Sequence, residues 1–271
     1  MALPDPAPHR TALVTGASSG IGEAIARDLV RRGHGVTLLA RRADRLEALA
    51  TELRSGGQRV EVLPTDLSDR SARAGLPGAI EALGLEVDIL INNAGLSTLG
   101  PVASSSPEAE MNMVEVDVMA VIDLCSRFTP AMLRRGRGAI LNVASTAAFQ
   151  PLPGQAGYGG SKAFVVSYTQ ALNTELRGTG VTATVLCPGP VDTGFGELAG
   201  FSIEDATKTL PKAMWVPAET VAAVGLDALA AGNVVAIPGA ANRFATRVSR
   251  LIPNRLLLPL LAKNHPGLKE Q

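Results

Sequence analysis

The sequence predicts an α/β fold, a doubly wound and mostly parallel sheet of seven strands with helices on both faces. Three observations lead to this class. Short β-branched or leucine-rich runs alternate with longer segments of helical period. The connections are long enough for crossovers, which join parallel strands and are right-handed. The 271 residues are 46% hydrophobic, which supplies the core of one large domain.

The expected strands are the short runs, which open or close with turn-forming residues. In chain order they are residues 11–16 (TALVTG), 35–40 (GVTLLA), 59–66 (RVEVLPTD), 87–95 (VDILINNAG), 138–145 (GAILNVAS), 181–189 (VTATVLCPG) and 233–239 (NVVAIPG). The expected helices fill the intervals, over residues 20–32, 43–54, 70–83, 108–135, 155–177 and 218–231. Because no linker or internal repeat interrupts this alternation, residues 10–240 are predicted to be one domain.

The two ends of the chain differ from that domain. Residues 1–9 contain prolines and no apolar run, so a short flexible leader is expected rather than a signal peptide. Residues 241–271 are expected to form an amphipathic extension, with Arg243, Arg247 and Arg250 at helical spacing and apolar side chains between them. Such a basic amphipathic segment can cover the substrate cleft, pack on a partner subunit, or lie on an anionic membrane surface. Its apolar run is too short to span a bilayer.

Composition narrows the class of partner. The chain has 25 basic and 25 acidic residues, so no basic field indicates a nucleic acid, and a small molecule is the expected ligand. Cys125 and Cys187 show neither metal-ligand nor redox spacing. They are expected to be reduced core residues of a cytoplasmic protein with no metal site.

A glycine-rich turn joins the first strand to the first helix. Residues 15–22 read TGASSGIG, directly after an apolar run and directly before a helical segment. Glycines permit a tight turn and close backbone approach, and a helix N-terminus offers unpaired N–H groups to a pyrophosphate. The strand-turn-helix context favours dinucleotide binding over a structural glycine turn. The candidate residues of this loop are Gly16, Ser18, Ser19, Gly20, Ile21 and Gly22.

The end of the second strand indicates which dinucleotide binds. Arg41 and Arg42 stand where an NAD site usually has an acidic residue for the ribose hydroxyls. A guanidinium can hold a 2′-phosphate through charge-assisted hydrogen bonds. NADP(H) is therefore expected rather than NAD(H), with Arg41 as the main contact and Ser18 or Arg42 in support. The alternative is that the two arginines only begin a solvated helix.

Tyr158 to Lys162 read YGGSK within an expected helix. Residues four apart share a helix face, so the lysine charge can lower the pKa of the phenol, which is about 10 when unperturbed. Together with TGASSGIG and with NNAG at residues 92–95, this motif resembles the short-chain dehydrogenase/reductase family of short, single-domain type. The resemblance covers nearly the whole chain and implies a Rossmann fold.

The resemblance implies roles for four residues. Tyr158 would be the general acid or base, and Lys162 would tune it and bind the nicotinamide ribose. Ser145, 13 residues before the tyrosine, would hydrogen-bond the substrate oxygen, with Thr146 as the neighbouring alternative. Asp117 stands where the family commonly has an asparagine. It is expected to support a proton relay, to slow the enzyme, or to face elsewhere, and these alternatives stay open.

The resemblance also implies further cofactor contacts. Asp66 and Leu67 would contact adenine, and Asn92, Ala94 and Gly95 would line the cofactor, although Asn92 could equally stabilise the central strands. The residues implied at the nicotinamide carboxamide are Pro188, Gly189, Val191 and Thr193.

The expected function is that of an NADP-dependent oxidoreductase, a carbonyl reductase or alcohol dehydrogenase. The resemblance implies a substrate lid over residues 194–217. Its apolar side chains, Phe195, Leu198, Phe201, Leu210, Met214 and Trp215, indicate a hydrophobic aldehyde, ketone or alcohol, or else only pack the lid onto the domain. The alternative function is an NADP(H)-binding sensor or scaffold with little turnover. A homodimer or homotetramer is expected.

Overall fold

The structure is a computed structural model, and it describes residues 2–194, 211–264 and 266–268. Seven strands form one sheet in the order β3-β2-β1-β4-β5-β6-β7, and every neighbouring pair is parallel. The strands are β1 (Arg10–Thr15), β2 (Val36–Ala40), β3 (Val60–Pro64), β4 (Glu86–Asn92), β5 (Gly138–Val143), β6 (Val181–Leu186) and β7 (Val235–Ala236). The predicted fold class is confirmed.

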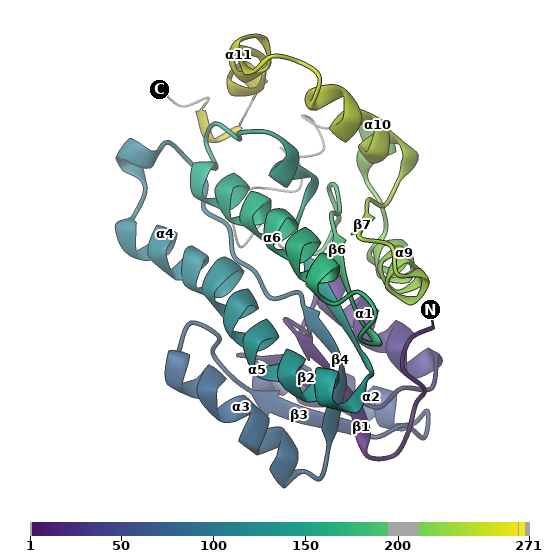
Figure 1. Cartoon of the computed structure of the whole chain (residues 1–271). Coiled ribbons are helices and arrows are strands. Elements are labelled where there is room, and N and C mark those ends of the chain that lie inside the picture. The colour runs from purple at the N-terminus through teal and green to yellow at the C-terminus, as the bar shows by residue number, and fades with distance from the viewer. Residues whose placement is uncertain (1, 195–210, 265, 269–271) are drawn as a thin grey trace.

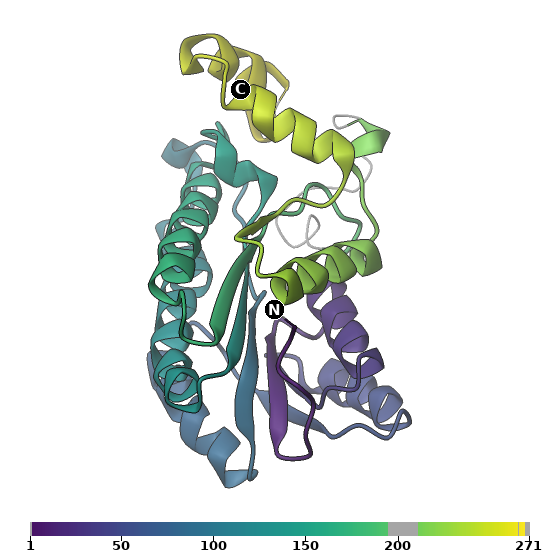
Figure 2. The same ribbon diagram turned by 45° about the vertical axis from the view of Figure 1, so that its right-hand side comes forward.

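Helices cover both faces of the sheet (Figure 1, Figure 2). On one face, α1 (Gly20–Arg31), α2 (Ala43–Arg54) and α9 (Ala218–Ala231) bury leucine, isoleucine and alanine side chains in one core cluster with the strands. On the other face, α3 (Arg70–Ala82), α5 (Ala120–Arg135) and α6 (Ala156–Glu175) build the second cluster. The sheet is therefore buried on both sides, as its nearly continuous apolar strands require.

Two helix starts follow capping residues in the sequence. Asp69 accepts hydrogen bonds from the N–H groups of Ser71 and Ala72 at the start of α3. Ser106 caps α4 (Pro107–Val114), which has its proline in the first turn, where no N–H is needed.

The expected helix over residues 108–135 is not one regular α-helix. A π-helical turn, Glu115–Met119, separates α4 from α5 and carries Asp117 at its centre. Such turns are rare and occur frequently at functional sites, because the extra residue redirects the side chains within the turn.

Strand order reverses between β1 and β4, so the loops that follow these strands diverge and leave a crevice at the carboxyl edge of the sheet. The predicted strands 87–95 and 181–189 end earlier than expected, at Asn92 and Leu186, and the residues beyond them become loops at this edge. The seventh strand has two residues, because only Val235 and Ala236 pair with β6.

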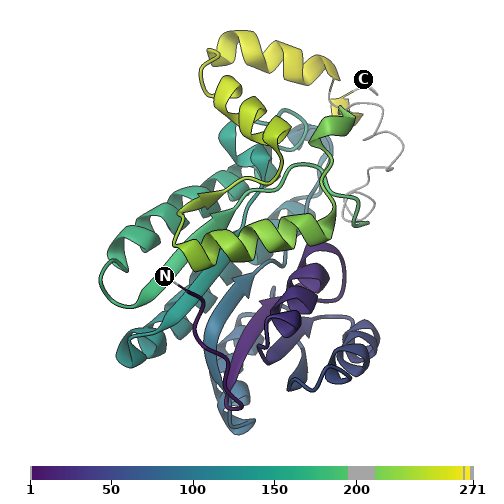
Figure 3. The same ribbon diagram turned by 90° about the vertical axis from the view of Figure 1, so that its right-hand side faces the viewer.

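The chain ends lie against the domain. Residues 2–9, the expected flexible leader, form no helix or strand, and Leu3 packs against the first core cluster. Beyond β7, the extension forms α10 (Ala240–Ser249) and α11 (Asn254–Asn264), which lie together at one end of the molecule (Figure 3). Among the described residues, no helix has the length and hydrophobicity that crossing a bilayer requires.

Candidate active site

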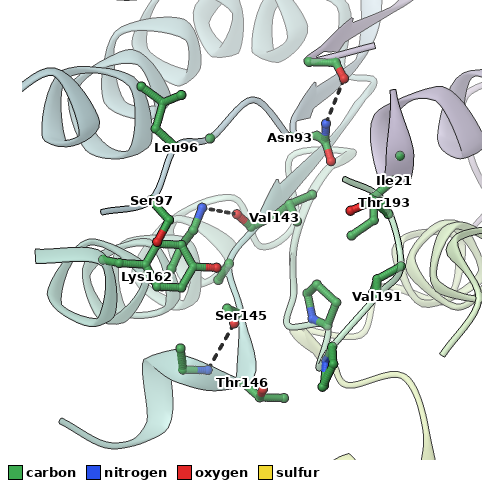
Figure 4. Close-up of a pocket in the computed structure, with 18 of the residues that line it drawn as sticks. Ile21, Asn93, Leu96, Ser97, Val143, Ser145, Thr146, Lys162, Val191 and Thr193 are labelled. Atoms are coloured by element: carbon green, nitrogen blue, oxygen red, sulfur yellow. Dashed lines mark hydrogen bonds between the residues drawn. The ribbon is translucent and has the colours of Figure 1, made fainter. Parts of the chain in front are cut away.

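A cavity of about 810 Å³ lies at the carboxyl edge of the sheet. Its wall is formed by the loops after β1 to β6, the start of α6 and both helices of the C-terminal extension. Figure 4 shows Ile21, Val191 and Thr193 on one side of it, opposite Ser97, Ser145 and Lys162. Pockets that bind small molecules and cofactors usually have volumes of roughly 300–1,000 Å³, so this cavity is of a suitable size for such a ligand.

The glycine-rich loop forms one end of the cavity. Five of its six candidate residues line the wall, namely Gly16, Ser18, Ser19, Gly20 and Ile21. Gly22 does not line it. A Cβ atom at Gly22 would lie 2.3 Å from the Gly16 carbonyl oxygen, so this glycine permits the loop to fold back on the first turn of α1. The loop presents the N-terminus of α1 to the cavity, an arrangement suited to a diphosphate.

The two arginines after β2 both line this end of the cavity. Arg42 donates to the hydroxyl oxygens of Ser18 and Ser19 at 2.9 and 3.0 Å, which fixes a positive charge beside the glycine loop. Arg41 is exposed and lines the cavity beside Arg42. Asp66 also lines the cavity, and the Ser68 backbone N–H holds the pKa of its carboxyl below the usual value.

Of the NNAG residues, Ala94 and Gly95 line the cavity and Asn92 does not. Asn92 is buried between strands, where its amide donates to the Asn142 oxygen at 2.8 Å. This geometry matches the strand-stabilising alternative for Asn92. Asn93, which was not a candidate, lines the cavity instead and donates to the Thr15 carbonyl oxygen at 3.0 Å, tying β4 to the glycine loop.

The three residues expected to carry the chemistry lie together in the cavity wall. Ser145, Tyr158 and Lys162 all line it, Ser145 just after β5 and the other two on the first turns of α6. The Lys162 ammonium lies 5.6 Å from the centre of the Tyr158 ring and donates to the Val143 carbonyl at 3.4 Å. Thr146, the alternative to Ser145, also lines the wall. Figure 4 shows Ser145 and Thr146 side by side after β5.

Asp117 faces Lys162 from the π turn and is fully enclosed, with 1% of its surface exposed. Its Oδ2 atom lies 2.9 Å from the Lys162 ammonium, and its Oδ1 atom accepts from the Leu96 N–H at 2.7 Å. A Cβ atom at Gly95 would lie 3.2 Å from the ammonium and 3.4 Å from both Asp117 oxygens, so the glycine leaves room for the ion pair. Asp117 does not line the cavity and acts on it through Lys162.

Burial and mutual charge shift the pKa of all three groups. Burial acts to lower the pKa of Lys162, but attraction to Asp117 raises it above its ordinary value, so the side chain stays protonated at neutral pH. Burial raises the pKa of Asp117, against the pull of Lys162. Burial also raises the pKa of Tyr158, while the Lys162 charge and a hydrogen bond with Ser145 lower it and Asp117 adds to the rise. The Asp117–Lys162 pair therefore lowers the pKa of Tyr158 less than an unpaired lysine would, because the negative charge of Asp117 opposes the positive charge of Lys162.

The loop after β6 forms another part of the cavity wall. Pro188, Gly189, Val191 and Thr193 line the cavity. A Cβ atom at Gly20 would lie 2.7 Å from the Thr193 Cβ, which places this loop against the glycine-rich turn.

The expected lid over residues 194–217 includes residues 195–210, which are outside the described residues, and with them Phe195, Leu198, Phe201 and Leu210. Met214 and Trp215 do line the cavity.

The C-terminal extension covers the far end of the cavity. Covering the cleft is one of the arrangements expected for residues 241–271. Its lining residues are Asn242, Ala245, Thr246, Ser249, Leu260 and Leu261. Asn242 is fully buried and donates to the carbonyl oxygens of Met214 and Pro238, both at 2.9 Å, which fixes α10 over the loop. The sequence alone does not single out Asn242, because its only signal is an asparagine inside a basic, apolar helix.

Neither cysteine belongs to this site. Both are free and buried, and burial raises the pKa of each thiol to about 12. Among the described residues, no group of three or more His, Cys, Asp and Glu side chains is placed to hold a metal ion.

The fold agrees with the comparisons to known proteins. A family model described as short chain dehydrogenase matches residues 10–199. The chain belongs to the short-chain dehydrogenase/reductase family and is an oxidoreductase of that class.

Three relatives illustrate the similarity. The NADP-dependent 3-hydroxy acid dehydrogenase YdfG of Salmonella typhi is 36% identical over 229 residues, which cover 79% of this chain and 91% of that protein. A short chain dehydrogenase of Pseudocercospora fijiensis is 36% identical over 189 residues, 69% of this chain, but the match spans only 61% of that protein's length. Among solved structures, a short-chain dehydrogenase from Sphingobium yanoikuyae in complex with NADPH superimposes with a TM-score of 0.79, at 31% identity over 92% of this chain and 95% of that one.

Proposed function

We propose that the protein is an NADP(H)-dependent oxidoreductase that interconverts an apolar carbonyl compound and its alcohol, with Tyr158 as the general acid and base. The observation that carries the proposal is the placement of Ser145, Tyr158 and Lys162 together in the wall of one cavity that begins at a glycine-rich helix N-terminus. When bound, the nicotinamide supplies or accepts the hydride. The chain's own residues hold the two reactants and move the proton.

NADP(H) is the proposed cofactor because of the charge beside the glycine loop. Arg42 is held on Ser18 and Ser19, and Arg41 lies next to it at the same end of the cavity. A 2′-phosphate would gain charge-assisted hydrogen bonds there. The NADPH complex of the Sphingobium relative and the NADP dependence stated for the Salmonella relative support the same choice.

In the proposed reaction, the Ser145 hydroxyl donates to the substrate oxygen, and the Tyr158 hydroxyl delivers its proton to that oxygen as it becomes an alkoxide. Lys162 stabilises the phenolate left behind, and Asp117 keeps Lys162 protonated. Removal of water from the cavity strengthens each of these interactions. Alcohol oxidation uses the same groups in reverse.

The substrate is proposed to be uncharged near its reacting carbon. Among the described lining residues the cationic side chains are Arg41, Arg42 and Lys162. The first two lie at the glycine-loop end, and the third is paired with Asp117. A substrate carboxylate would therefore find no free cation among the described residues near Tyr158, whereas Leu96, Leu152, Met214, Trp215, Leu260 and Leu261 offer an apolar surface.

The test is NADPH oxidation, followed by absorbance, with a panel of hydrophobic aldehydes and ketones and with 3-oxo acids for comparison. Tyr158→Phe is expected to lower kcat/KM by about 10²–10⁴-fold, the usual contribution of a general acid. Tyr168→Phe is the matched control, because the chain has two tyrosines and Tyr168 stacks on Phe164 outside the cavity wall. Binding of NADPH without turnover of any compound would contradict the proposal and favour a sensor or scaffold.

A further inference from the structure

The outward face of the C-terminal helices exposes large apolar side chains. Nine large hydrophobic residues of the described chain are prominently exposed, and four of them lie in this short extension. They are Phe244 at 70%, Leu251 at 83%, Leu256 at 63% and Leu260 at 59%. Side chains that contact water to this extent contribute little to folding, so their concentration in one segment indicates a contact surface.

The same segment carries positive charge only. Residues 240–264 contain no Asp or Glu, whereas the whole chain is balanced at 25 against 25. The basic residues of the segment are Arg243, Arg247, Arg250, Arg255 and Lys263. Arg247 and Arg255 are exposed and form no ion pair with any described residue, so their charge is available to a partner.

Helical spacing places the charged and apolar groups together. On α10 and its end, Phe244, Arg247 and Leu251 fall at positions i, i+3 and i+7. On α11, Leu256 and Lys263 fall at i and i+7, whereas Leu260 also borders the cavity and is not counted on the outward face. The opposite faces are occupied by the protein, because Asn242, Thr246 and Leu257 are buried. Each helix therefore packs on the domain with one face and presents a basic, apolar face outward.

We propose that this outward face of α10 and α11 binds the surface of a lipid bilayer that contains anionic lipids. Arginine and lysine would contact lipid phosphates while Phe244, Leu251 and Leu256 enter the boundary between headgroups and acyl chains. A second copy of the chain is a poorer occupant, because a symmetric contact places the same patch on both sides and would bring basic residues against basic residues. The inference does not depend on the identity of the substrate.

The position of the face adds a geometric reason. The helices lie at one end of the molecule in all three views (Figure 1, Figure 2, Figure 3), so a flat surface can approach them without meeting the rest of the domain. Leu261 lines the cavity on the inner side of α11. The bilayer would therefore lie next to the apolar end of the active site.

The test is sedimentation of the full chain with phosphatidylcholine vesicles, with and without about one third phosphatidylglycerol. The wild type is expected to bind the anionic vesicles and to dissociate at about 1 M salt, where the screening length falls to about 3 Å. Arg247→Ser with Arg255→Ser is expected to weaken binding about 30-fold, from about 1 kcal/mol for each arginine. Phe244→Ser with Leu251→Ser should weaken it by at least tenfold.

Two matched controls separate a specific face from a general effect. Arg45→Ser with Arg177→Ser removes two exposed charges elsewhere, and Val102→Ser with Met111→Ser removes two exposed apolar side chains elsewhere. Both controls should bind vesicles as the wild type does, and all variants should keep the wild-type melting temperature. Failure of the wild type to bind anionic vesicles overturns the proposal. Equal loss in the controls, or a dimer that the face variants dissociate, overturns it as well.

Discussion

The substitution Asp117→Asn tests how the buried ion pair tunes Tyr158, the proposed general acid. The Asp117 and Lys162 charges are 2.9 Å apart, which corresponds to about 6 kcal/mol of attraction at an effective dielectric constant of about 20. Desolvation of both groups offsets much of this attraction, but removal of one charge leaves the other buried without compensation. The free energy of unfolding of the variant is therefore expected to fall by about 3–5 kcal/mol at neutral pH.

The same substitution should change the pH profile of carbonyl reduction. The carboxylate raises the pKa of both Tyr158 and Lys162, so the amide variant should lose the proton from each at lower pH. In the proposed reaction, reduction needs a protonated tyrosine beside a protonated lysine. The alkaline limb of kcat/KM is therefore expected to move to lower pH, with activity retained near neutrality. The raised pKa values of Tyr158 and Lys162 also affect stability. A group whose pKa is higher in the folded state than in the unfolded state contributes its whole stabilisation at pH values below the unfolded pKa. That stabilisation is lost as the pH rises through the folded pKa.

The assays are kcat/KM with NADPH across pH, and urea unfolding followed by the fluorescence of Trp215, the chain's single tryptophan. Asp123→Asn is the matched control, since Asp123 is on α5, pairs with Arg73 at 3.0 Å and does not contact Lys162. It should lower stability and leave the pH profile in place. An alkaline limb in Asp117→Asn that coincides with that of the wild type would refute the reasoning.

Three further outcomes are expected. Arg42→Ala should raise the KM for NADPH by about 10–100-fold and leave that for NADH nearly unchanged, because charged hydrogen bonds contribute about 1.5–3 kcal/mol; steady-state kinetics with both cofactors measures the difference. Glu115→Gln should lower the unfolding free energy by about 1–3 kcal/mol, because the buried Arg73 guanidinium loses a partner. Hydrogen bonds from Arg70 and Arg73 lower the pKa of Glu115, so its contribution is present above about pH 4.5 and is lost as pH falls through the folded pKa; urea titrations of both proteins should converge in acid. Gly160→Ala should raise the unfolding free energy by about 0.5–1 kcal/mol in a thermal melt, because a Cβ atom there meets no neighbour within 4 Å in a helical turn; a lower melting temperature would contradict this.

The sequence predicted the sheet, its flanking helices and most of the cavity wall. These features depend on short-range rules: apolar runs form buried strands, and glycine before a helix leaves room for a tight loop. The placement of Tyr158 and Lys162 on one helix face follows from their spacing alone. The same rules placed the expected strand and helix boundaries within a few residues of those observed.

Other features depend on contacts that no local pattern encodes. Asn92 and Asn93 are adjacent asparagines at the end of β4, and the alternation of a strand decides which one faces the cavity. The π turn at Glu115–Met119 lies within a continuous helical pattern, so the residue types there predict an α-helix and not a π turn. The role of Asn242 depends on where α10 packs after β7, which is a tertiary property.

The π turn also rotates the faces of α4 relative to those of α5. An α-helix turns by about 100° per residue, and the extra residue of a π turn offsets the faces before and after it. The α4 segment can therefore point Met113 at Gly157 of α6, while α5 independently aims Leu124 at the sheet. Deleting one residue between Glu115 and Met119 would force the two halves into a single register. One of the two packing contacts would then be lost, and Asp117 would rotate away from the lysine.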